Sequence, residues 1–174
     1  MQSSDIQPLV NYYHRKIAQV NLRFKRYLFE SINWESRIIG IKGARGVGKT
    51  TLLLQRVLEK YSNIDETFYI SLDHLWFKSH SLEELVEYLY NRGITELYID
   101  EVHKYKDWSQ VLKTFYDEFE DLRIVYTGSS MLEIENSGTD LARRQTTYTL
   151  DGMSFREYLN YTDMLDIPPV TLQE

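Results

Sequence analysis

Apolar residues along the chain form two kinds of pattern, short runs and sets spaced by three or four residues. The short apolar or alternating runs predict strands over residues 37–41, 67–72, 96–100, 122–127 and 145–150. The spaced sets predict helices from about 51 to 61, from 81 to 89 and from 107 to 119, and a short helix capped by Ser154. Strands that alternate with helices indicate an α/β fold with a central parallel sheet and right-handed crossovers.

The first 35 residues have a different pattern. We expect residues 1 to about 10 to be a loose lead-in. Apolar residues then recur at spacings of four and three and predict an amphipathic helix through Tyr13, Ile17, Val20, Phe24 and Leu28. The other face of this helix would carry the basic residues Arg15, Lys16, Arg23, Lys25 and Arg26. That face is interpreted either as solvated or as a contact for a nucleic acid or a partner.

Composition narrows the class of protein. A chain of 174 residues is long enough for one domain with a full core. A net charge of −6 argues against nonspecific binding of nucleic acid or anionic membranes by the whole surface, and leaves room for a local basic patch. The absence of cysteine excludes disulfides and thiolate metal sites. Neither a membrane-length apolar run nor a signal peptide is recognisable, so we expect a cytoplasmic location.

Residues 43–50 fit the pattern G-x-x-x-x-G-K-[ST] of a phosphate-binding loop, and they lie between a predicted strand and a predicted helix. Glycines let the backbone turn tightly and aim its N–H groups at phosphates, and the helix adds the positive end of its dipole. Lys49 would reach the β- and γ-phosphates, the Thr50 hydroxyl would ligate Mg²⁺, and Thr51 could touch the α-phosphate. Arg45 has a second interpretation, contact with a partner or another ligand. The predicted nucleotide-binding residues are Gly43, Ala44, Arg45, Gly46, Val47, Gly48, Lys49, Thr50 and Thr51.

A second motif is the acidic pair Asp100 and Glu101, at the end of the apolar strand predicted over 96–100. Open parallel sheets bind ligands at the carboxyl ends of their strands. Asp100 is therefore predicted to hold Mg²⁺, through a water molecule, and Glu101 to polarise the attacking water as a general base. The alternative for Glu101 is a solvated residue in a turn.

Further candidates follow the next strand. Thr127, Ser129 and Ser130 could hydrogen-bond the γ-phosphate or the water, although a serine there could equally be the N-cap of a helix. Arg143 and Arg144 could stabilise charge on the transferring phosphoryl group, from the same chain or from a neighbour, or be plain surface arginines.

Three other polar or aromatic residues receive a structural interpretation. The four histidines lack the spacing of metal ligands, so His103 is predicted to be part of the local structure. Trp108 is predicted to anchor the start of a helix rather than to stack on a base. Asp73 is left out of the catalytic set.

Five segments in one order resemble the prokaryotic AAA-type ATPases that usually carry an uncharacterised, nuclease-like C-terminal domain. The segments are residues 43–53, residues 98–104, Asp107 with Trp108, residues 127–130 and residues 153–159, so the resemblance covers about 38–159. It implies a three-layer P-loop NTPase sandwich with strand order 5-1-4-3-2. It also implies that Asp100 and Glu101 are the acidic motif and that Ser129 or a neighbour senses the γ-phosphate. The family often has a glycine–arginine pair where this chain has Ala142, Arg143 and Arg144.

The resemblance also implies a division of the chain. Residues 1–35 would be the lead-in and amphipathic helix, 36–160 the ATPase core, and 161–174 the start of a C-terminal region that is truncated here. Family members usually continue into a winged-helix-like segment and the nuclease-like domain.

The leading hypothesis is an ATP-binding and ATP-hydrolysing module that depends on Mg²⁺ and whose nucleotide state drives a conformational change. Its catalytic residues would be Glu101, Lys49, Ser129 and Arg143, and its metal ligands Thr50 and Asp100. Alternatives are a nucleotide-dependent interaction module with little turnover and a P-loop kinase with an arginine lid. A GTPase would need an asparagine–lysine–x–aspartate motif, which the sequence lacks. Beyond ATP, a homo-oligomer or protein partner is compatible with the sequence, a nucleic-acid partner has no specific support, and no membrane contact is expected.

Overall fold

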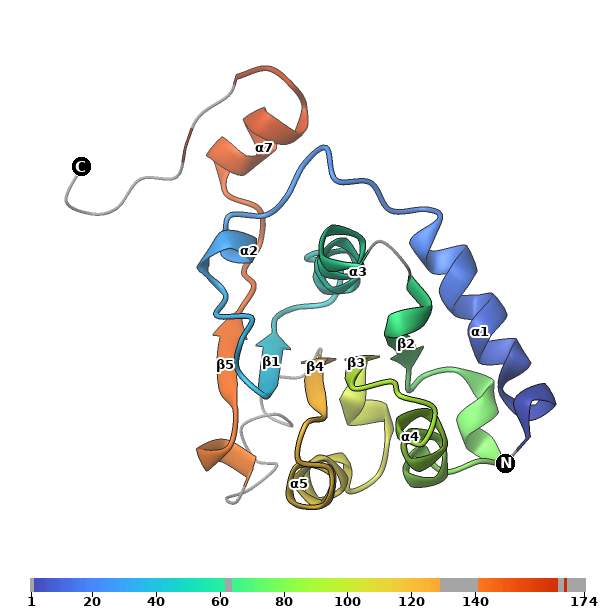
Figure 1. The fold of residues 1–174 in the computed structure, drawn as a ribbon. Helices are drawn as coiled ribbons and strands as arrows, with labels where there is room; N and C mark the ends of the chain where they lie inside the picture. The colour runs from blue at the N-terminus through green and yellow to red at the C-terminus, as the bar shows by residue number, and fades with distance from the viewer. Residues whose placement is uncertain (1, 62–63, 129–140, 166–167, 169–174) are drawn as a thin grey trace.

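The computed structural model describes residues 2–61, 64–128, 141–165 and 168. Its centre is one parallel sheet of five strands in the order β2-β3-β4-β1-β5 (Figure 1). The strands are β1 (Ile38–Lys42), β2 (Phe68–Ser71), β3 (Glu96–Asp100), β4 (Arg123–Gly128) and β5 (Thr146–Thr149). Each lies within one residue of its predicted ends, and the order is the predicted 5-1-4-3-2 counted from the other edge. The predicted fold is confirmed.

Helices cover both faces of this sheet. The helices are α1 (Ser3–Ile17), α2 (Leu28–Ser31), α3 (Lys49–Lys60), α4 (Leu82–Tyr90), α5 (Trp108–Glu118) and α7 (Phe155–Tyr161). Short 3₁₀ turns are η1 (Ile64–Glu66), η2 (Leu75–Lys78), η3 (Val102–Lys104) and η4 (Leu141–Arg143). Helix α3 lies over one face, and α4 and α5 lie over the other (Figure 1). No helix in the described ranges is long and apolar enough to cross a bilayer.

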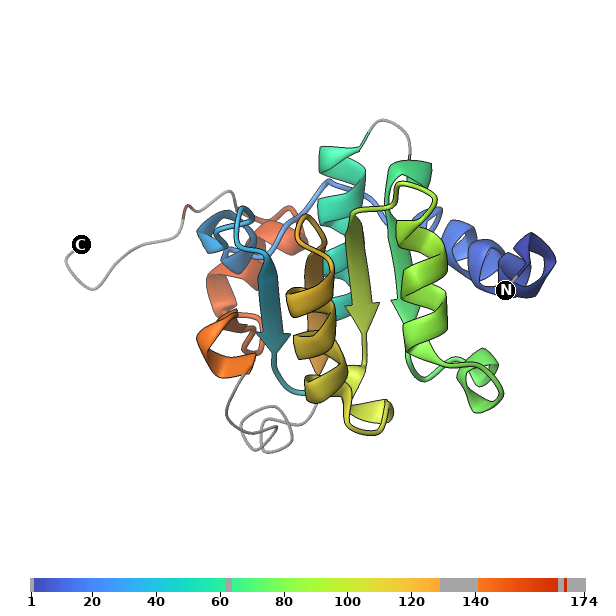
Figure 2. The same ribbon diagram turned by 60° about the horizontal axis from the view of Figure 1, so that its bottom comes forward.

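Alternation along the strands divides the core into two clusters. In β1, Ile38 packs with the α4–α5 side, whereas Ile39 and Ile41 pack with α3. Successive side chains of a strand point to opposite faces, so both faces of a central strand must be apolar to fill both layers. All five residues of β3 are buried. The sheet is thus a rigid platform, and its strands all end at the same edge (Figure 2).

The predicted N-terminal helix is present with Tyr13 and Ile17 on its buried face, but its predicted bounds are wrong at both ends. Residues 3–17, expected in part to be a loose lead-in, form helix α1, whose buried stripe is Ile6, Leu9, Tyr13 and Ile17. This stripe has helical spacing of three and four, and it packs beside β2 and α3. The expected continuation through Phe24 to Leu28 is absent, because the helix ends at Ile17 and only the four-residue α2 follows.

Tertiary contacts explain why the helix stops. The Gln55 side-chain amide donates hydrogen bonds to the carbonyl oxygens of Asn21 at 2.9 Å and Phe24 at 2.7 Å. These two carbonyls therefore bond to a side chain of α3, in place of the N–H groups of a continuing helix. Arg26, expected on a solvated or partner-binding helix face, is only 8% exposed. That interpretation is wrong for Arg26.

Local signals set most of the other helix ends. The Ser81 hydroxyl accepts a hydrogen bond from the Glu84 N–H at 3.1 Å, and Gly93 follows α4 with φ of 87°. Asp107 precedes α5 as predicted, but its side chain makes no capping bond. Trp108 is buried at the start of this helix against Tyr126, with ring centroids 5.3 Å apart, as an anchor should be.

Candidate nucleotide-binding site

The loop of residues 43–48 connects the end of β1 to the first turn of α3, as the motif requires. Gly46 and Gly48 have φ of 84° and 100°, a region that glycine adopts at little cost. Helix α3 begins at Lys49 and runs for 12 residues, so its N-terminal N–H groups and dipole face the loop. A glycine-rich turn in front of a helix N-terminus is the backbone arrangement that typically binds anions.

Gly43, the first glycine of the loop, has no room for a side chain. A Cβ built on Gly43 would lie 2.2 Å from the Leu150 carbonyl oxygen, well inside van der Waals contact. Leu150 cannot retreat easily, because its N–H donates to the Lys42 carbonyl at 2.8 Å. The loop is therefore held against the chain that follows β5.

Lys49 lies inside the loop that it belongs to. Lys49 is only 5% exposed. Its ammonium group donates hydrogen bonds to the carbonyl oxygens of Gly43 and Ala44, each at 2.8 Å. Burial lowers the pKa of Lys49, while the nearby carboxylates of Glu101 and Asp100 act in the opposite direction. The positive charge of Lys49 therefore interacts with the negative charges of Asp100 and Glu101 across the loop.

Asp100 is the centre of the site's polar network. Its carboxylate is 3% exposed and accepts hydrogen bonds from the hydroxyls of Thr50 at 2.6 Å, Tyr69 at 3.0 Å, and Thr127. The structure thus brings the two predicted metal ligands, Thr50 and Asp100, into contact. These hydroxyl and carboxylate oxygens are hard donors of the type that Mg²⁺ prefers, so the residues fit the ion. The described residues contain no group of three or more His, Asp or Glu side chains that could hold a metal, so an ion here would rely on Thr50 and Asp100.

Sequence reasoning missed Tyr69, which pairs with Tyr98 in the sheet register. Asp100 is two residues beyond Tyr98 on the same strand, so the Tyr69 hydroxyl reaches it along the diagonal of the sheet. Burial, and then the charge of Asp100, raise the pKa of Tyr69, which keeps the phenol protonated as a donor. The signal that could have found it is a tyrosine in a strand that otherwise carries only apolar and small residues.

Glu101 begins a turn immediately after β3. Its backbone is left-handed, with φ of 57°, which is uncommon for a residue with a side chain. The Glu101 N–H donates to the Thr127 hydroxyl at 3.1 Å, and one carboxylate oxygen lies 3.3 Å from the Nε2 of His103. Its side chain is 25% exposed, so water can reach a carboxylate that the turn holds beside Asp100. His103 belongs to the local structure of this turn.

The remaining predicted site residues divide into two groups. Thr127, a candidate for sensing phosphate, hydrogen-bonds to Asp100 and Glu101. Ser129 and Ser130 lie outside the described residues. Arg143 is exposed in η4, which contacts α5, and the next residue, Arg144, pairs with Asp117 at 3.2 Å. Asp117 is in the last turn of α5, and among the described contacts none joins Arg143 to the phosphate loop of its own chain.

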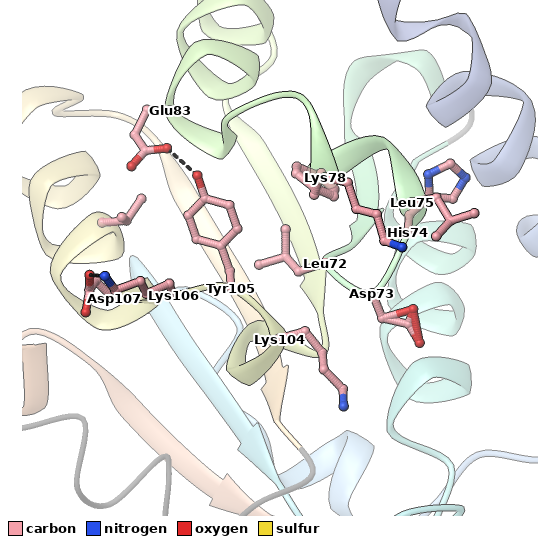
Figure 3. Close-up of a pocket in the computed structure, with 12 residues that line it drawn as sticks. Leu72, Asp73, His74, Leu75, Lys78, Glu83, Lys104, Tyr105, Lys106 and Asp107 are labelled. Atoms are coloured by element: carbon pink, nitrogen blue, oxygen red, sulfur yellow. Dashed lines mark hydrogen bonds and ion pairs between the residues drawn. The ribbon is translucent and has the colours of Figure 1, made fainter.

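Two pockets border the site. One, of about 350 Å³, is lined by loop residues 46–48, Thr51, Phe24, Arg26, Met153 and Tyr161. The other, of about 740 Å³, lies between η2 and the turn after Glu101 and is lined by Asp73, Lys78, Lys104 and Tyr105 among others (Figure 3). In it the Tyr105 hydroxyl donates to Glu83 at 2.7 Å. The first pocket adjoins the phosphate loop. The second is lined by Leu72 and Lys104, whose N–H groups donate to the carbonyls of Asp100 and Glu101.

Comparison with known proteins assigns a family to this geometry. Residues 35–159, most of the chain, match a family model described as an AAA domain. The chain belongs to the AAA domain family. This AAA domain contains the phosphate loop, both acidic residues and the Ser154 helix start within the matched range, so it is an ATP-binding module.

Two solved structures are similar to parts of the chain. One match is PCH-2 from C. elegans, with 18% identity, a TM-score of 0.44, and coverage of 84% of the present chain and 41% of that chain. Another is a DNA replication initiation factor, with 15% identity, a TM-score of 0.49, and coverage of 94% and 51% respectively. The chain thus spans about half the length of these structures or less. A search of curated proteins gives no significant match.

Proposed function

We propose that this AAA domain binds ATP with Mg²⁺ and hydrolyses the γ-phosphate with water activated by Glu101. The observation that carries the proposal is the contact between Thr50 of the phosphate loop and Asp100 at the end of β3, at 2.6 Å. This contact brings together two motifs that are 50 residues apart in the sequence. P-loop NTPases hold their magnesium ion between a threonine or serine of the phosphate loop and an aspartate of this kind.

The pocket of about 350 Å³ supports the nucleoside part of the proposal. It adjoins the glycines of the phosphate loop and has an apolar wall that includes Phe24, Met153 and Tyr161. A base and ribose suit such a pocket, because a flat apolar surface with a few polar groups is typical of small-molecule sites. The phosphates would then extend along the loop towards Lys49.

In the proposed reaction, Glu101 accepts a proton from water while the water oxygen bonds to the γ-phosphorus. The bond from that phosphorus to the bridging oxygen breaks, which releases ADP and phosphate. Lys49 and the loop N–H groups stabilise the negative charge of the phosphates. A magnesium ion held by Thr50 and Asp100 would neutralise further negative charge on the phosphates.

Two variants test the proposal. Glu101→Gln keeps the shape of the side chain but cannot accept a proton, so turnover should fall by roughly 10²- to 10⁴-fold while ATP affinity persists. Lys49→Ala should weaken ATP binding by roughly tenfold or more, because a charged hydrogen bond to the phosphates is lost. Calorimetric titration with ATP and Mg²⁺ and a phosphate-release assay measure these quantities. Normal turnover in Glu101→Gln would remove Glu101 from the mechanism, and unchanged affinity in Lys49→Ala would refute the phosphate-loop assignment.

A nucleotide-dependent interaction module with little turnover is the second candidate. The pocket of about 740 Å³ favours it, because the wall of this pocket is bonded directly to the acidic motif. The Leu72 N–H donates to the Asp100 carbonyl at 2.9 Å, and Lys104 follows Glu101 by three residues. A change at the γ-phosphate could thus alter a partner's contact there. A wild-type chain that binds ATP tightly but shows no phosphate release would favour this candidate.

Several finer points are part of the same proposal. Arg143 would act in trans, on the site of a neighbouring copy, since η4 packs on α5 and no described contact joins Arg143 to its own phosphate loop. The division at residues 35 and 160, the nuclease-like continuation and the cytoplasmic location stay predictions. An Arg143→Ala variant with normal turnover in a concentration-dependent assay would contradict the role in trans.

A further inference from the structure

A buried arginine joins three separate segments beside the phosphate loop. Arg26 is 8% exposed, and its Nη1 donates to the Val47 carbonyl of the loop at 2.7 Å. Its Nη2 donates to the carbonyls of Asp151 at 3.0 Å and Gly152 at 3.2 Å, both after β5. Its Nε donates to Glu157 of helix α7 at 2.8 Å. The planar guanidinium offers its donors in a fixed fork, so these contacts define its position closely.

Glu157 is held as firmly as the arginine. It is 5% exposed, and besides Arg26 it accepts hydrogen bonds from the Tyr27 N–H at 3.0 Å, the Ser154 N–H at 2.9 Å and the Ser154 hydroxyl at 3.0 Å. Burial acts to raise the pKa of Glu157, but the bonds from Arg26, Ser154 and Tyr27 outweigh it and lower the pKa to about 2. At neutral pH this residue is a fully bonded carboxylate that orients Arg26.

The bond to Val47 determines a backbone direction inside the loop. The described chain has no cis peptide bonds, and in a trans peptide the C=O of one residue and the N–H of the next point in opposite directions. When Arg26 holds the Val47 carbonyl on one side of the loop, the Gly48 N–H is directed to the other side. Gly48 has φ of 100° and no side chain that would restrict rotation of the peptide group between Val47 and Gly48. The hydrogen bond from Arg26 therefore fixes the orientation of this peptide group.

Arg26 differs in this respect from Lys49. The carbonyls of Gly43 and Ala44 are held by Lys49, which the phosphates would draw away. The Val47 carbonyl is held by a group that has four other protein contacts and no reason to leave. We infer that Arg26 is a positioning residue that aims the Gly48 N–H into the phosphate cradle, and that Glu157 makes helix α7 a part of the nucleotide site.

This inference rests on the proposed nucleotide binding and adds a regulatory connection to it. Coupling between two sites is reciprocal, so phosphates that order the loop must also strengthen the docking of α7. Conversely, anything that pulls Glu157 from Arg26 would loosen the cradle. The neighbouring pair of Lys25 with Glu59 has no contact with the loop and provides a matched comparison.

The test compares ADP with adenosine in Arg26→Lys, Glu157→Gln and the control Glu59→Gln. Each dissociation constant is measured by competition with a fluorescent nucleotide, well below the melting temperature. The first two variants should bind ADP roughly tenfold or more weakly, the worth of a well-placed hydrogen bond to a charged phosphate. Adenosine should lose affinity by a clearly smaller factor, because Arg26 and Tyr161 also line the nucleoside pocket. Glu59→Gln should match wild type for both ligands. Folded Arg26→Lys and Glu157→Gln with wild-type ADP affinity, or with equal losses for ADP and adenosine, would overturn the inference.

A second measurement covers variants that fail to fold. In wild type, saturating ADP should slow amide hydrogen exchange in residues 155–161 of α7, and leave α4, on the opposite face of the sheet, unchanged. Unchanged exchange in α7 with ADP bound would refute the connection while leaving nucleotide binding intact. A folded wild-type chain that binds no ADP would overturn both this inference and the proposed function, so the two failures are distinguishable.

Discussion

The Arg26–Glu157 pair should make the free energy of unfolding of the protein depend on pH. Glu157 has a pKa of about 2 in the folded protein, against an ordinary value of 4.5. Because the folded pKa is the lower one, the carboxylate stabilises the fold above about pH 4.5 and this stabilisation is lost as the pH falls towards 2. At roughly 1.4 kcal/mol for each pH unit, the full effect is about 3 kcal/mol, and about 1 kcal/mol of it is gone by pH 3.5.

The assay is urea unfolding of wild type and Glu157→Gln at several values between pH 7 and pH 3.5. The variant should be less stable by about 3 kcal/mol at pH 7, because a buried arginine loses its charged partner. This difference should shrink as wild-type Glu157 becomes protonated in the unfolded state, whereas other carboxylates cancel in the comparison. Glu59→Gln breaks a more exposed ion pair and should differ from wild type by less than about 1 kcal/mol throughout. A difference for Glu157→Gln that stays constant from pH 7 to pH 3.5 would refute the reasoning.

Two further predictions concern packing around the site. Gly43→Ala should destabilise the fold by about 3 kcal/mol or more in urea, since its methyl group would meet the Leu150 carbonyl at 2.2 Å, whereas Gly152→Ala meets nothing within 4 Å and should be neutral. Equal stability of these two variants would contradict the close approach. Tyr69→Phe should cost about 1 kcal/mol by removing a donor to buried Asp100, and should raise the Mg²⁺ concentration needed for half-maximal ATP binding. A variant unchanged in both measurements would show that this hydroxyl does not support Asp100.

Elements whose signals are local were predictable. The phosphate loop is one continuous segment, so its glycines, lysine and threonine are recognisable without any tertiary information. Strands β1 and β3 are short apolar runs next to these motifs, and alternation with helices leads to a parallel sheet. The serine at position 154 caps α7 through a bond with the Glu157 N–H at 3.2 Å, three residues on.

The N-terminal segment shows where such reasoning fails. Tyr13, Val20 and Leu28 have helical spacing, but spacing is only a preference. The Gln55 side chain donates hydrogen bonds to the backbone carbonyls of residues 21 and 24, so tertiary hydrogen bonds replace those of a helix. The basic residue at 26 looks like its solvated neighbours in the sequence, and only its partners, 131 residues away in the case of Glu157, reveal that it is buried.

The amino-acid sequence alone therefore determined the chemistry of the phosphate loop, the acidic pair and the order of strands and helices. The tertiary structure decided which groups surround them: Tyr69 and Thr127 on Asp100, and Arg26 with Glu157 behind the loop. The physical reason is that hydrogen-bond and helix-end signals act over a few residues, whereas burial of a charged or phenolic group depends on segments that meet only when the sheet is assembled.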